Sequence, residues 1–537
     1  MTWRTIGRTT GRFAALAGLC LAGASAPCAA AEELILGRYP AMTEGGRQLV
    51  ALTLRDVLEL ALERNYGLQA SRASQGASQQ TLKAAQERLQ PTLAGSLGSS
   101  NTVLLGITPN APSAGAPSSF FSLASQGQTQ LSSSLTQQDW LGNTYALDYS
   151  ETQVQTRNLV IPQQGDTPRQ GRPSQLADVS TMTGSVTLPL VQGQGREFNR
   201  IPVGQAEVGL RLTRAGALQQ EQTVISTAAQ AYWNLAGELL NIAVIEQAVA
   251  LDEQLVHDNQ VRASAGTLVP SDVQASETQL AIDRRNLIQA RLQALTLEDQ
   301  LRAALGLDNL GYGIKPVDTP TVRPADFDTN EQLQRVYANS PVLAQLQANL
   351  ENNGYDLLAA KNVAKPQVNL ALSYTLMGTG NQPFEGTSSF DQSATQGNSA
   401  GLNVNTPLRD RVGPANVQRR VNEQGALELN IRNQRASLAV QLQTALRNIL
   451  AAREQDEAAH VAVALAQTQL DNEVRRLRAG TSTAFLVAQL QQQLSLAQQQ
   501  EIGARIQFEL SDIARRVLTG EIDSRVGASA PKGMPDS

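Results

Sequence analysis

The sequence predicts a mainly α-helical protein with a membrane β-barrel, in which long antiparallel helices form a coiled-coil barrel and the chain is built from two internal structural repeats. Three observations support this fold class. Landmark motifs occur twice in the same order along the 537 residues, apolar residues recur at every seventh position over long stretches, and shorter stretches alternate apolar with polar residues. Spacing by seven is typical of packed helices, and alternation is typical of strands with one apolar face.

The repeated landmarks divide the chain into two halves. Residues 83–91 close an Ala-rich helical stretch with a proline, and residues 358–366 do the same in the second half. Residues 262–267 likewise recur as residues 476–481, each containing an Ala-Gly-Thr sequence. A repeat of this length indicates duplication of a domain-sized unit.

The first residues have the layout of a cleaved secretory signal. Arg4, Arg8 and Arg12 precede an apolar run over 13–24, and three alanines end at position 31. The alternative is an amphipathic or single membrane-spanning helix, for which the run is short. Both cysteines lie inside this segment, so the mature chain is expected to contain no disulfide.

These features predict six parts of the chain. They are a signal peptide at 1–31, an irregular lead-in at 32–51, a first repeat at 52–305 with a long insertion at 104–177, a linker at 306–328, a second repeat at 329–520 and a disordered tail at 521–537.

The helices of the first half are predicted from caps and heptads. Thr53 followed by Asp56 is a helix start, and a break is expected near residues 65–67. Heptad spacing then runs from Val203 to Val256, and a similar pattern covers 413–478 in the second half. Helices of about 60–67 residues follow from these spans. A soluble coiled-coil scaffold would show the same heptads.

Alternating stretches predict strands at 180–190, at 366–376 and at 402–405. A soluble sandwich would alternate in the same way. However, no run after the signal segment approaches the length of a helical membrane span, so entry into a membrane would require a closed β-barrel. The formal net charge of −5 disfavours a nucleic-acid partner.

The sequence resembles the TolC family of outer-membrane efflux and secretion channels. The resemblance rests on Leu52-Thr53-Leu54, on Leu89-Gln90-Pro91, on Leu188-Pro189-Leu190-Val191 and on the two Ala-Gly-Thr turns. It implies a homotrimer in the outer membrane, with a long periplasmic helical portion and with four strands from each chain in a 12-stranded β-barrel. It also implies a periplasmic adaptor (membrane fusion) protein and an inner-membrane pump of RND or ABC type as partners.

The resemblance also assigns candidate sites. The adaptor-docking periplasmic tip comprises Ala265, Gly266, Thr267, Ala479, Gly480 and Thr481, although these glycines also serve simply to turn the chain. The pore entrance comprises Asp272, Phe485, Leu486 and Gln489; Asp272 is also placed to compensate a helix dipole, and the acidic pair of some relatives is absent at Leu486 and Gln489. Pro91, Pro189, Pro366 and Pro407 mark the junctions between strands and helices.

The surplus length of the first half departs from the family pattern. Residues 129–135 and 144–150 are predicted to form an additional hairpin, either over the extracellular mouth or within the barrel wall. Both placements are compatible with the sequence.

No enzyme is predicted. His257 and His460 are the only histidines and have no zinc spacing, no phosphate-binding or nucleophile motif occurs, and five methionines do not favour copper binding. No cofactor and no metal are therefore expected. The predicted function is the outer-membrane channel-tunnel of a tripartite export system, a passive exit duct for drugs, toxic compounds or type I secretion polypeptides. The alternative is a secreted or periplasmic structural coiled-coil protein without a pore.

Overall fold

A computed structural model describes residues 41–521, except 45–46, 110–118, 162–174, 267, 308–311, 325, 392–393 and 480. The predicted signal peptide at 1–31, the first part of the lead-in and the tail beyond Glu521 lie outside the described residues. The chain divides into two compact units, which are described separately. One comprises Met1–Ala73, Ala215–Ala344 and Asn433–Ser537, and the other comprises Ser74–Arg214 and Gln345–Arg432.

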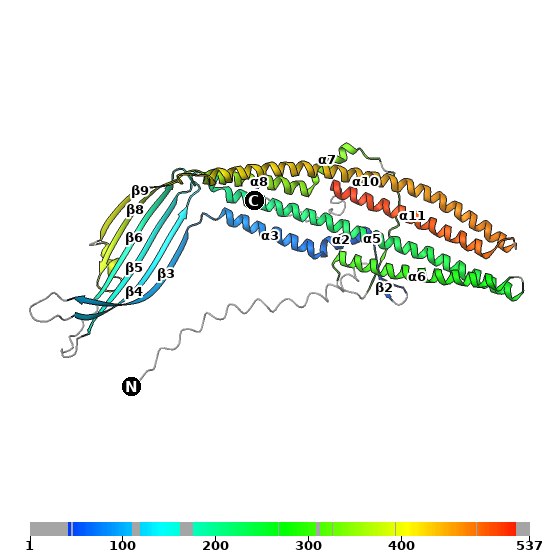
Figure 1. The fold of residues 1–537 in the computed structure, drawn as a ribbon, viewed down its shortest axis with the longest axis horizontal. Helices are drawn as coiled ribbons and strands as arrows, with labels where there is room; N and C mark the ends of the chain where they lie inside the picture. Colours follow the sequence, from blue (N-terminus) through cyan, green and yellow to red (C-terminus); the bar gives the residue numbers. More distant parts are fainter. Residues whose placement is uncertain are drawn as a thin grey trace, which may run out of the picture. The chain divides into compact units, whose positions relative to one another are not determined.

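The second of these units contains a six-stranded antiparallel sheet within the described residues, in the order β3-β4-β5-β6-β8-β9 (Figure 1). Its strands are β3 (Thr92–Pro109), β4 (Ser119–Gln138), β5 (Thr144–Ile161), β6 (Gln175–Pro189), β8 (Gln367–Gly380) and β9 (Thr395–Asn405). The strands predicted at 180–190, 366–376 and 402–405 lie in β6, β8 and β9. The two edges of the sheet are β3 and β9.

The number of strands differs from the four per chain that the family resemblance implies. The predicted insertion at 104–177 supplies all of β4 and β5, and the pair lies between β3 and β6 inside the sheet. The additional hairpin therefore lies within the sheet. The physical reason is that apolar and polar residues alternate in β4 and β5 as they do in β3 and β6. Each strand therefore adds its apolar residues to the apolar face and its polar residues to the polar face.

Pairing register places most of the large apolar side chains of the six strands on one face. Leu97 lies opposite Leu131, Leu135 opposite Leu147, and Leu370 opposite Leu402. Large side chains of this apolar face are exposed in the single chain; they are Leu93, Leu97, Leu131, Leu135, Tyr145, Leu147, Met182, Leu372, Tyr374, Leu402 and Val404. The sheet thus has one predominantly apolar face.

The opposite, polar face has small hydroxyl side chains that bond across neighbouring strands. Thr92 and Thr136 approach to 2.7 Å, Ser96 and Ser132 also to 2.7 Å, and Ser373 and Ser399 to 2.8 Å. Ser134 donates to Asp148 on the same face. Such cross-strand pairs fix the register of a sheet because a slip by one residue would exchange its two faces.

Helices in this unit begin and end close to the strands. α3 (Tyr66–Gln86) precedes β3, α4 (Arg196–Asn199) follows β6, and α8 (Pro341–Val363) precedes β8. α3 and α8 each continue along the chain from the other unit. The short α9 (Glu385–Ser388) and a 3₁₀ turn lie between β8 and β9.

The other unit contains two antiparallel helix pairs, α5 with α6 and α10 with α11 (Figure 1). α5 (Ile201–Ser264) has 64 residues and α10 (Val412–Arg478) has 67, which confirms the predicted helix lengths, although each begins in the sheet-containing unit. α6 (Pro270–Leu305) and α11 (Ala484–Thr519) return beside them. Ion pairs join the partners, including the exposed pair of Arg284 with Glu253 at 2.8 Å and the half-buried pair of Arg505 with Asp456 at 2.9 Å.

The predicted start and break of the first helix are confirmed. Thr53 and Asp56 form a capping box for α2 (Leu54–Arg64), in which each side chain accepts from the backbone N–H of the other residue. α2 ends at its C-cap residue Asn65, and α3 follows directly. The first helical segment is therefore set by local polar bonds, as its sequence indicates.

A small sheet differs from the irregular lead-in and extended linker of the sequence analysis. β1 (Ala41–Glu44) and β2 (Arg47–Leu52) pair with each other, and β2 pairs with β7 (Gly313–Pro316) from the linker. Val50 and Ile314 enter the main apolar core together with Tyr232 of α5. The hydroxyl of Tyr232 donates to Asp318 at 2.9 Å, and the same carboxylate accepts from the N–H of Leu54 at 2.6 Å.

A buried ion pair connects this sheet to the end of α6. Arg302 is 4% exposed and donates to Glu298 and to the carbonyl of Tyr312. Glu298 in turn accepts from the N–H of Ile314 at 3.1 Å. Two charges removed from water are tolerated here because each has several polar partners.

Arg302→Ala is expected to lower the free energy of unfolding by about 3–5 kcal/mol, because it leaves the buried Glu298 carboxylate uncompensated. The matched control Arg291→Ala removes an exposed pair with Glu246 and is expected to cost about 1 kcal/mol or less. Chemical denaturation followed by helical circular dichroism measures both. Equal losses in the two variants would contradict the role of the buried pair.

Candidate functional site

The first predicted tip turn joins α5 to α6. Ala265 donates to the carbonyl of Val261 at 3.1 Å, and Gly266 donates to that of Ala263 at 3.0 Å, which closes the last turn of α5. Gly266 has a φ of +73°, a left-handed conformation that glycine adopts without strain. Thr267 lies outside the described residues.

The second predicted tip turn joins α10 to α11. Ala479 donates to the carbonyl of Arg475 at 3.0 Å, and both the N–H and the hydroxyl of Thr481 donate to that of Arg476. Thr483 then caps α11 by accepting from the N–H of Leu486 at 3.4 Å. Gly480 lies outside the described residues.

The structure brings the two helix pairs together beside these turns. The guanidinium of Arg262, in the last turn of α5, donates to the carbonyl of Leu477 in the last turn of α10 at 3.3 Å. Leu255 packs in one apolar cluster with Leu477 and with Val487 of α11. Both Ala-Gly-Thr turns therefore belong to one end of the same helix bundle.

Three of the four predicted pore-entrance residues line one cavity of about 500 Å³ between the first turns of α6 and α11. They are Asp272, Phe485 and Gln489. Asp272 lies in the first turn of α6, where a carboxylate is favoured by the helix dipole. Phe485 is 72% exposed, and Leu486, which does not line this cavity, is also exposed.

A buried carboxyl pair lies between α5 and α6, and the sequence analysis missed it. Asp252 is buried, and its carboxyl faces Asp283 of α6. Burial first, and then the neighbouring Asp283, raises the pKa of Asp252 from 3.8 to about 8. The sequence does contain a signal, because Asp252 lies four residues from Val256 of the heptad seam. Its partner Asp283 becomes visible only when α5 is paired with α6.

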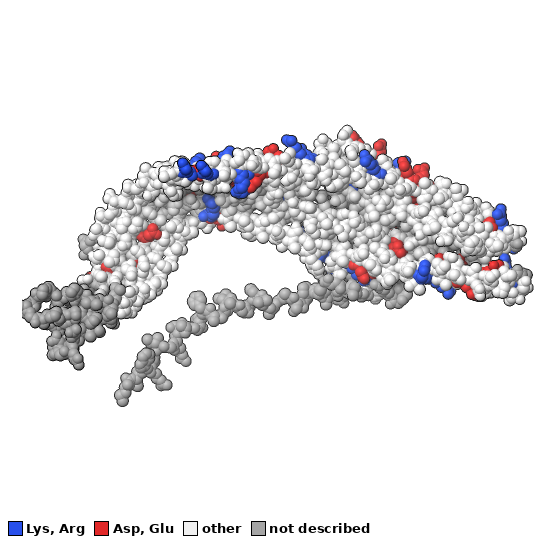
Figure 2. Space-filling model, in the orientation of Figure 1, with Lys and Arg blue, Asp and Glu red and all other residues white. Residues whose placement is uncertain are grey.

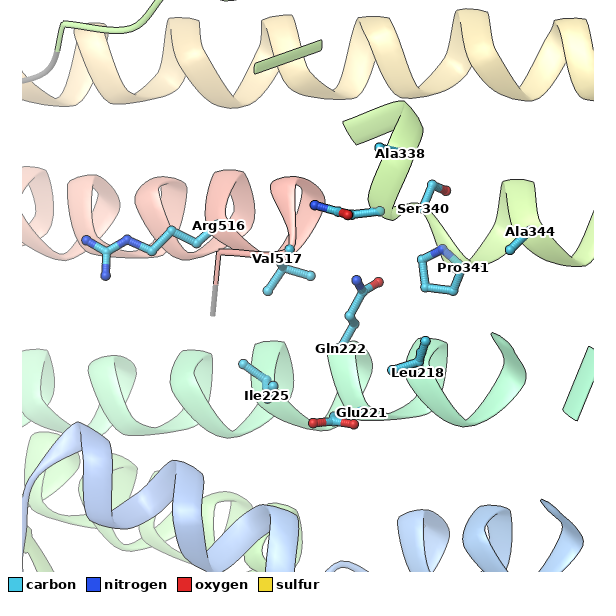
Figure 3. Close-up of a pocket in the computed structure, with 12 residues that line it drawn as sticks. Leu218, Glu221, Gln222, Ile225, Ala338, Ser340, Pro341, Ala344, Arg516 and Val517 are labelled. Atoms are coloured by element: carbon cyan, nitrogen blue, oxygen red, sulfur yellow. The ribbon is translucent and has the colours of Figure 1, made fainter. Parts of the chain in front are cut away.

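A second cavity, of about 290 Å³, is formed within the same unit (Figure 3). Leu218, Gln222 and Ile225 line it from α5, and Arg516 and Val517 from α11. Pro341, the first residue of α8, lines it just after the end of α7 (Thr329–Asn339). None of the predicted site residues lines it. Its lining contains no nucleophile beside a general base, which is the arrangement that would indicate catalysis.

The four junction prolines lie at strand ends. Pro91 and Pro366 immediately precede β3 and β8, Pro189 is the last residue of β6, and Pro407 follows the end of β9. Exposed cations gather within about ten residues of them; these are Arg88, Arg196, Arg200, Lys361, Lys365, Arg409 and Arg411. Figure 2 shows Lys and Arg side chains beside the sheet, whose own visible face has few charged side chains.

A polar cluster, also missed from the sequence, interrupts the apolar face of the sheet. Glu151 and Asp178 are buried there beneath the segment that contains α9. Glu151 accepts from the N–H of Phe384 at 3.1 Å, and Asp178 accepts from that of Gly386 at 2.8 Å. The segment approaches so closely that a Cβ on Gly378 would lie 2.0 Å from the Gly386 carbonyl oxygen.

Comparison with known families matches residues 332–521 to the Outer membrane efflux protein family. Residues 332–521 are an outer membrane efflux protein domain. A search of curated proteins returned no match. The resemblance to the TolC family is confirmed by this match and by the solved structures that share the fold of the efflux protein domain and of the residues before it.

Three solved structures are similar over 87% of this chain. The Campylobacter jejuni CmeC outer membrane channel is 14% identical, with 85% of that chain covered and a TM-score of 0.61. The outer membrane protein VceC from Vibrio cholerae is 13% identical, with 96% covered and a TM-score of 0.61. The open state of the Neisseria gonorrhoeae MtrE outer membrane channel is 15% identical, with 88% covered and a TM-score of 0.56.

Two further observations concern membranes and metals. Among the described residues, α5 alone is long and apolar enough to cross a membrane by composition, with a mean hydropathy of 1.2 in its most apolar window. The core helix of a soluble protein passes the same test, so this is weak support for a helical span. The described part of the chain contains no group of three or more His, Cys, Asp or Glu that could hold a metal ion.

Stability is expected to fall as pH rises from about 4 to about 8, because folded Asp252 binds its proton more tightly than the unfolded chain does. Asp252→Asn removes this cost, so it is expected to raise the melting temperature more at about pH 8.5 than at about pH 5.5. Calorimetry at the two pH values measures the difference.

Asp258→Asn, at an exposed position on the same helix, is the control and is expected to have no such pH-dependent effect. The same gain in both variants, or a gain for Asp252→Asn at the lower pH only, would contradict the raised pKa.

Proposed function

We propose that this protein is the outer-membrane channel-tunnel of a tripartite export system and acts as a passive exit duct. The observation that carries the proposal is the exposed apolar face of the six-stranded sheet. The same chain has long helices in coiled-coil pairs, and its residues 332–521 match the Outer membrane efflux protein family. The cargo is either small toxic compounds or secreted polypeptides. The duct itself leaves that choice to the pump.

The apolar face requires an apolar partner. Leu93 and Leu97 are each 75% exposed and Leu402 is 61% exposed, while all six strands contribute to the same face. An exposed apolar surface of this extent on a soluble protein would be an aggregation hazard. Lipid acyl chains satisfy it, and strands that alternate lipid-facing with lumen-facing residues are typical of outer-membrane barrels.

The polar face of the sheet is suited to line a water-filled passage. Its small serine and threonine hydroxyls remain close to the backbone and leave the space above the sheet open. Charged side chains are rare on it, although Asp148 is one. Such a lining hydrates a solute without binding it strongly, which suits a passive duct.

The cations at the strand ends fit a membrane boundary. Long basic side chains extend their charge toward headgroups while their stems remain in the apolar layer. The group around the four junction prolines is exposed and contains more cations than carboxylates. We place the periplasmic surface of the membrane at this level, where anionic headgroups attract these side chains.

Unpartnered apolar side chains on the helices support assembly with further copies. On α10, exposed Val440, Leu450 and Val461 recur at about three helical turns, and α6 exposes Ile288 and Leu292. Stripes of this kind on coiled-coil helices bind other helices. A homotrimer in which α6 and α10 of neighbouring copies pack together would bury the exposed apolar side chains of both helices.

We also propose functions for the two tip turns and for the pore entrance. The two Ala-Gly-Thr turns, at one end of the bundle, are proposed to dock the periplasmic adaptor, which connects the duct to an inner-membrane pump. Asp272 of three copies would favour cations over anions at the entrance. Because Leu486 and Gln489 supply no acidic ring, we propose that exposed Phe485 and Leu486 narrow the pore by apolar contact.

A coiled-coil scaffold without a pore is the competing function. It accounts for α5, α6, α10 and α11, but it leaves the exposed apolar face of the sheet without a partner. Insertion of purified protein into lipid bilayers distinguishes the two functions, since only a channel produces conductance steps.

Leu372→Lys is expected to destabilise the membrane-inserted protein by about 2–4 kcal/mol, because it places a charge on the apolar face of β8. The adjacent Ser373→Lys, on the polar face, is the matched control and is expected to leave stability nearly unchanged. Heat-dependent migration of outer-membrane trimers measures both variants. If Ser373→Lys were the more damaging change, the assignment of lipid and lumen to the two faces would be reversed.

A photoreactive residue at Thr481 is expected to crosslink a periplasmic adaptor in cells, and mass spectrometry of the adduct identifies it. Thr81 on α3, exposed but far along the chain from either turn, is the control position. Crosslinks only between copies of this chain, or equal adaptor capture from both positions, would contradict the docking role of the tip.

A further inference from the structure

We propose that all six strands of each chain stand in the barrel wall, so that three copies close an 18-stranded barrel in which β3 of one chain pairs with β9 of the next. This inference rests on the proposed trimeric channel. It departs from the 12-stranded barrel that the family resemblance implies, and it makes the duct wider where it crosses the membrane.

The first support is the continuous pairing of the additional hairpin. β4 pairs with β3 from Thr92↔Thr136 to Pro109↔Ser119, and with β5 from Gln138↔Thr144 to Phe121↔Ile161. β5 pairs onward with β6 from Thr144↔Thr187. A lid over the mouth would leave β3 and β6 as neighbours, whereas here the hairpin separates them along the whole length of β6.

The second support is that the hairpin has both surfaces that a barrel wall needs. Leu131, Leu135 and Leu147 continue the apolar face across β4 and β5. On the opposite side, Ser132 continues the hydroxyl pairing to Ser96 at 2.7 Å. A hairpin surrounded by water on both sides would have no need of an apolar face.

The third support is the way the hairpin is fixed at its base. Its turn lies against the segment that follows β6, where Gly195 donates to the carbonyl of Leu141 at 3.0 Å. A Cβ on Gly142 would lie 2.4 Å from the carbonyl oxygen of Gly193, and Gly142 has a φ of +92°. The turn is thus packed into the junction region beside Pro189 and not extended beyond it.

The two open edges of the sheet indicate that the strand pairing with each of them belongs to another copy of this chain. β3 and β9 have no strand partner on their outer sides among the described residues, and backbone groups cannot remain unpaired in lipid. Six antiparallel strands alternate in direction, so β3 and β9 run oppositely. Copies that share one membrane orientation therefore pair β3 with β9 as antiparallel neighbours, whereas β9 against β9 would be parallel.

The consequence is a change in width. Barrel diameter grows roughly in proportion to strand number, so 18 strands give a lumen about 1.5-fold wider than 12 strands do. The hydroxyl-lined face of β4 and β5 becomes part of the lumen wall in each copy.

Disulfide crosslinking tests the edge pairing. Ser96→Cys on β3 is combined in turn with Ser399→Cys, Gly401→Cys and Asn403→Cys on β9, all on the polar face, after the natural Cys20 and Cys28 are replaced with serine. At least one combination is expected to yield covalent trimers on oxidation of intact outer membranes. The matched control uses Ser132→Cys on β4, beside Ser96 but inside the sheet, and is expected to yield none.

Crosslinking through Ser132 in place of Ser96 would overturn the proposal, and so would trimers that conduct but never crosslink from Ser96. Absence of trimers altogether would instead count against the proposed function, which keeps the two failures distinct.

Lumen width provides a second measurement. Excision of residues 110–174 removes β4 and β5 and joins β3 to β6, which run antiparallel, so the variant retains four strands. Exclusion of graded uncharged polymers, added to the barrel side of single channels, is expected to give a limiting radius smaller by about a third. An unchanged limiting radius would overturn the wider barrel.

Discussion

A strand in lipid must pair both of its edges, and the rest of this protein is organised around that requirement. Six strands of one chain satisfy it everywhere except at the outer sides of β3 and β9. In the proposed trimer those two sides are satisfied by neighbouring copies, so that the membrane itself would make assembly obligatory. The apolar face adds a second demand of the same origin, since it is stable only against acyl chains. Alternation of apolar and hydroxyl side chains meets both demands at once and leaves a hydrated surface on the inside.

The helices meet a comparable requirement in water by a different method. Within one chain, α5 with α6 and α10 with α11 bury part of their apolar stripes, and polar pairs such as Arg284 with Glu253 keep the outer faces wet. The apolar stripes that stay exposed on α6 and α10 are the surfaces that we propose to pack against neighbouring copies. Burial of Asp252 against Asp283 is costly within this packing, because one carboxyl must keep its proton near neutral pH. The helix ends near the tip are held by backbone turns and by the Arg262 contact, which leaves the side chains of Phe485 and Leu486 exposed.

Much of the fold was predictable because its signals are local or periodic. The capping box at Thr53, the break at Asn65 and the lengths of α5 and α10 follow from neighbouring residues or from heptads. β4 and β5 were harder, since serine and glutamine occupy most of β4 and leucine occurs only at wide intervals. The β1-β2-β7 sheet joins segments more than 260 residues apart, and no local pattern encodes such pairing. For the same reason the contacts of Glu151 and Asp178 with the α9 segment could not be predicted. The tip turns were located by their motif, while the cavity that joins Asp272, Phe485 and Gln489 required the packing of α6 on α11.

The serine- and threonine-rich polar face has a consequence for the cell that carries this protein. A hydrated, weakly charged lining offers little resistance to any polar solute that fits, in either direction. The portion within the membrane therefore cannot act as the permeability barrier of the envelope. If the barrier is the proposed constriction of Phe485 and Leu486 on α11, a defect there would make the outer membrane leaky to large hydrophilic antibiotics even while every strand remained correctly paired.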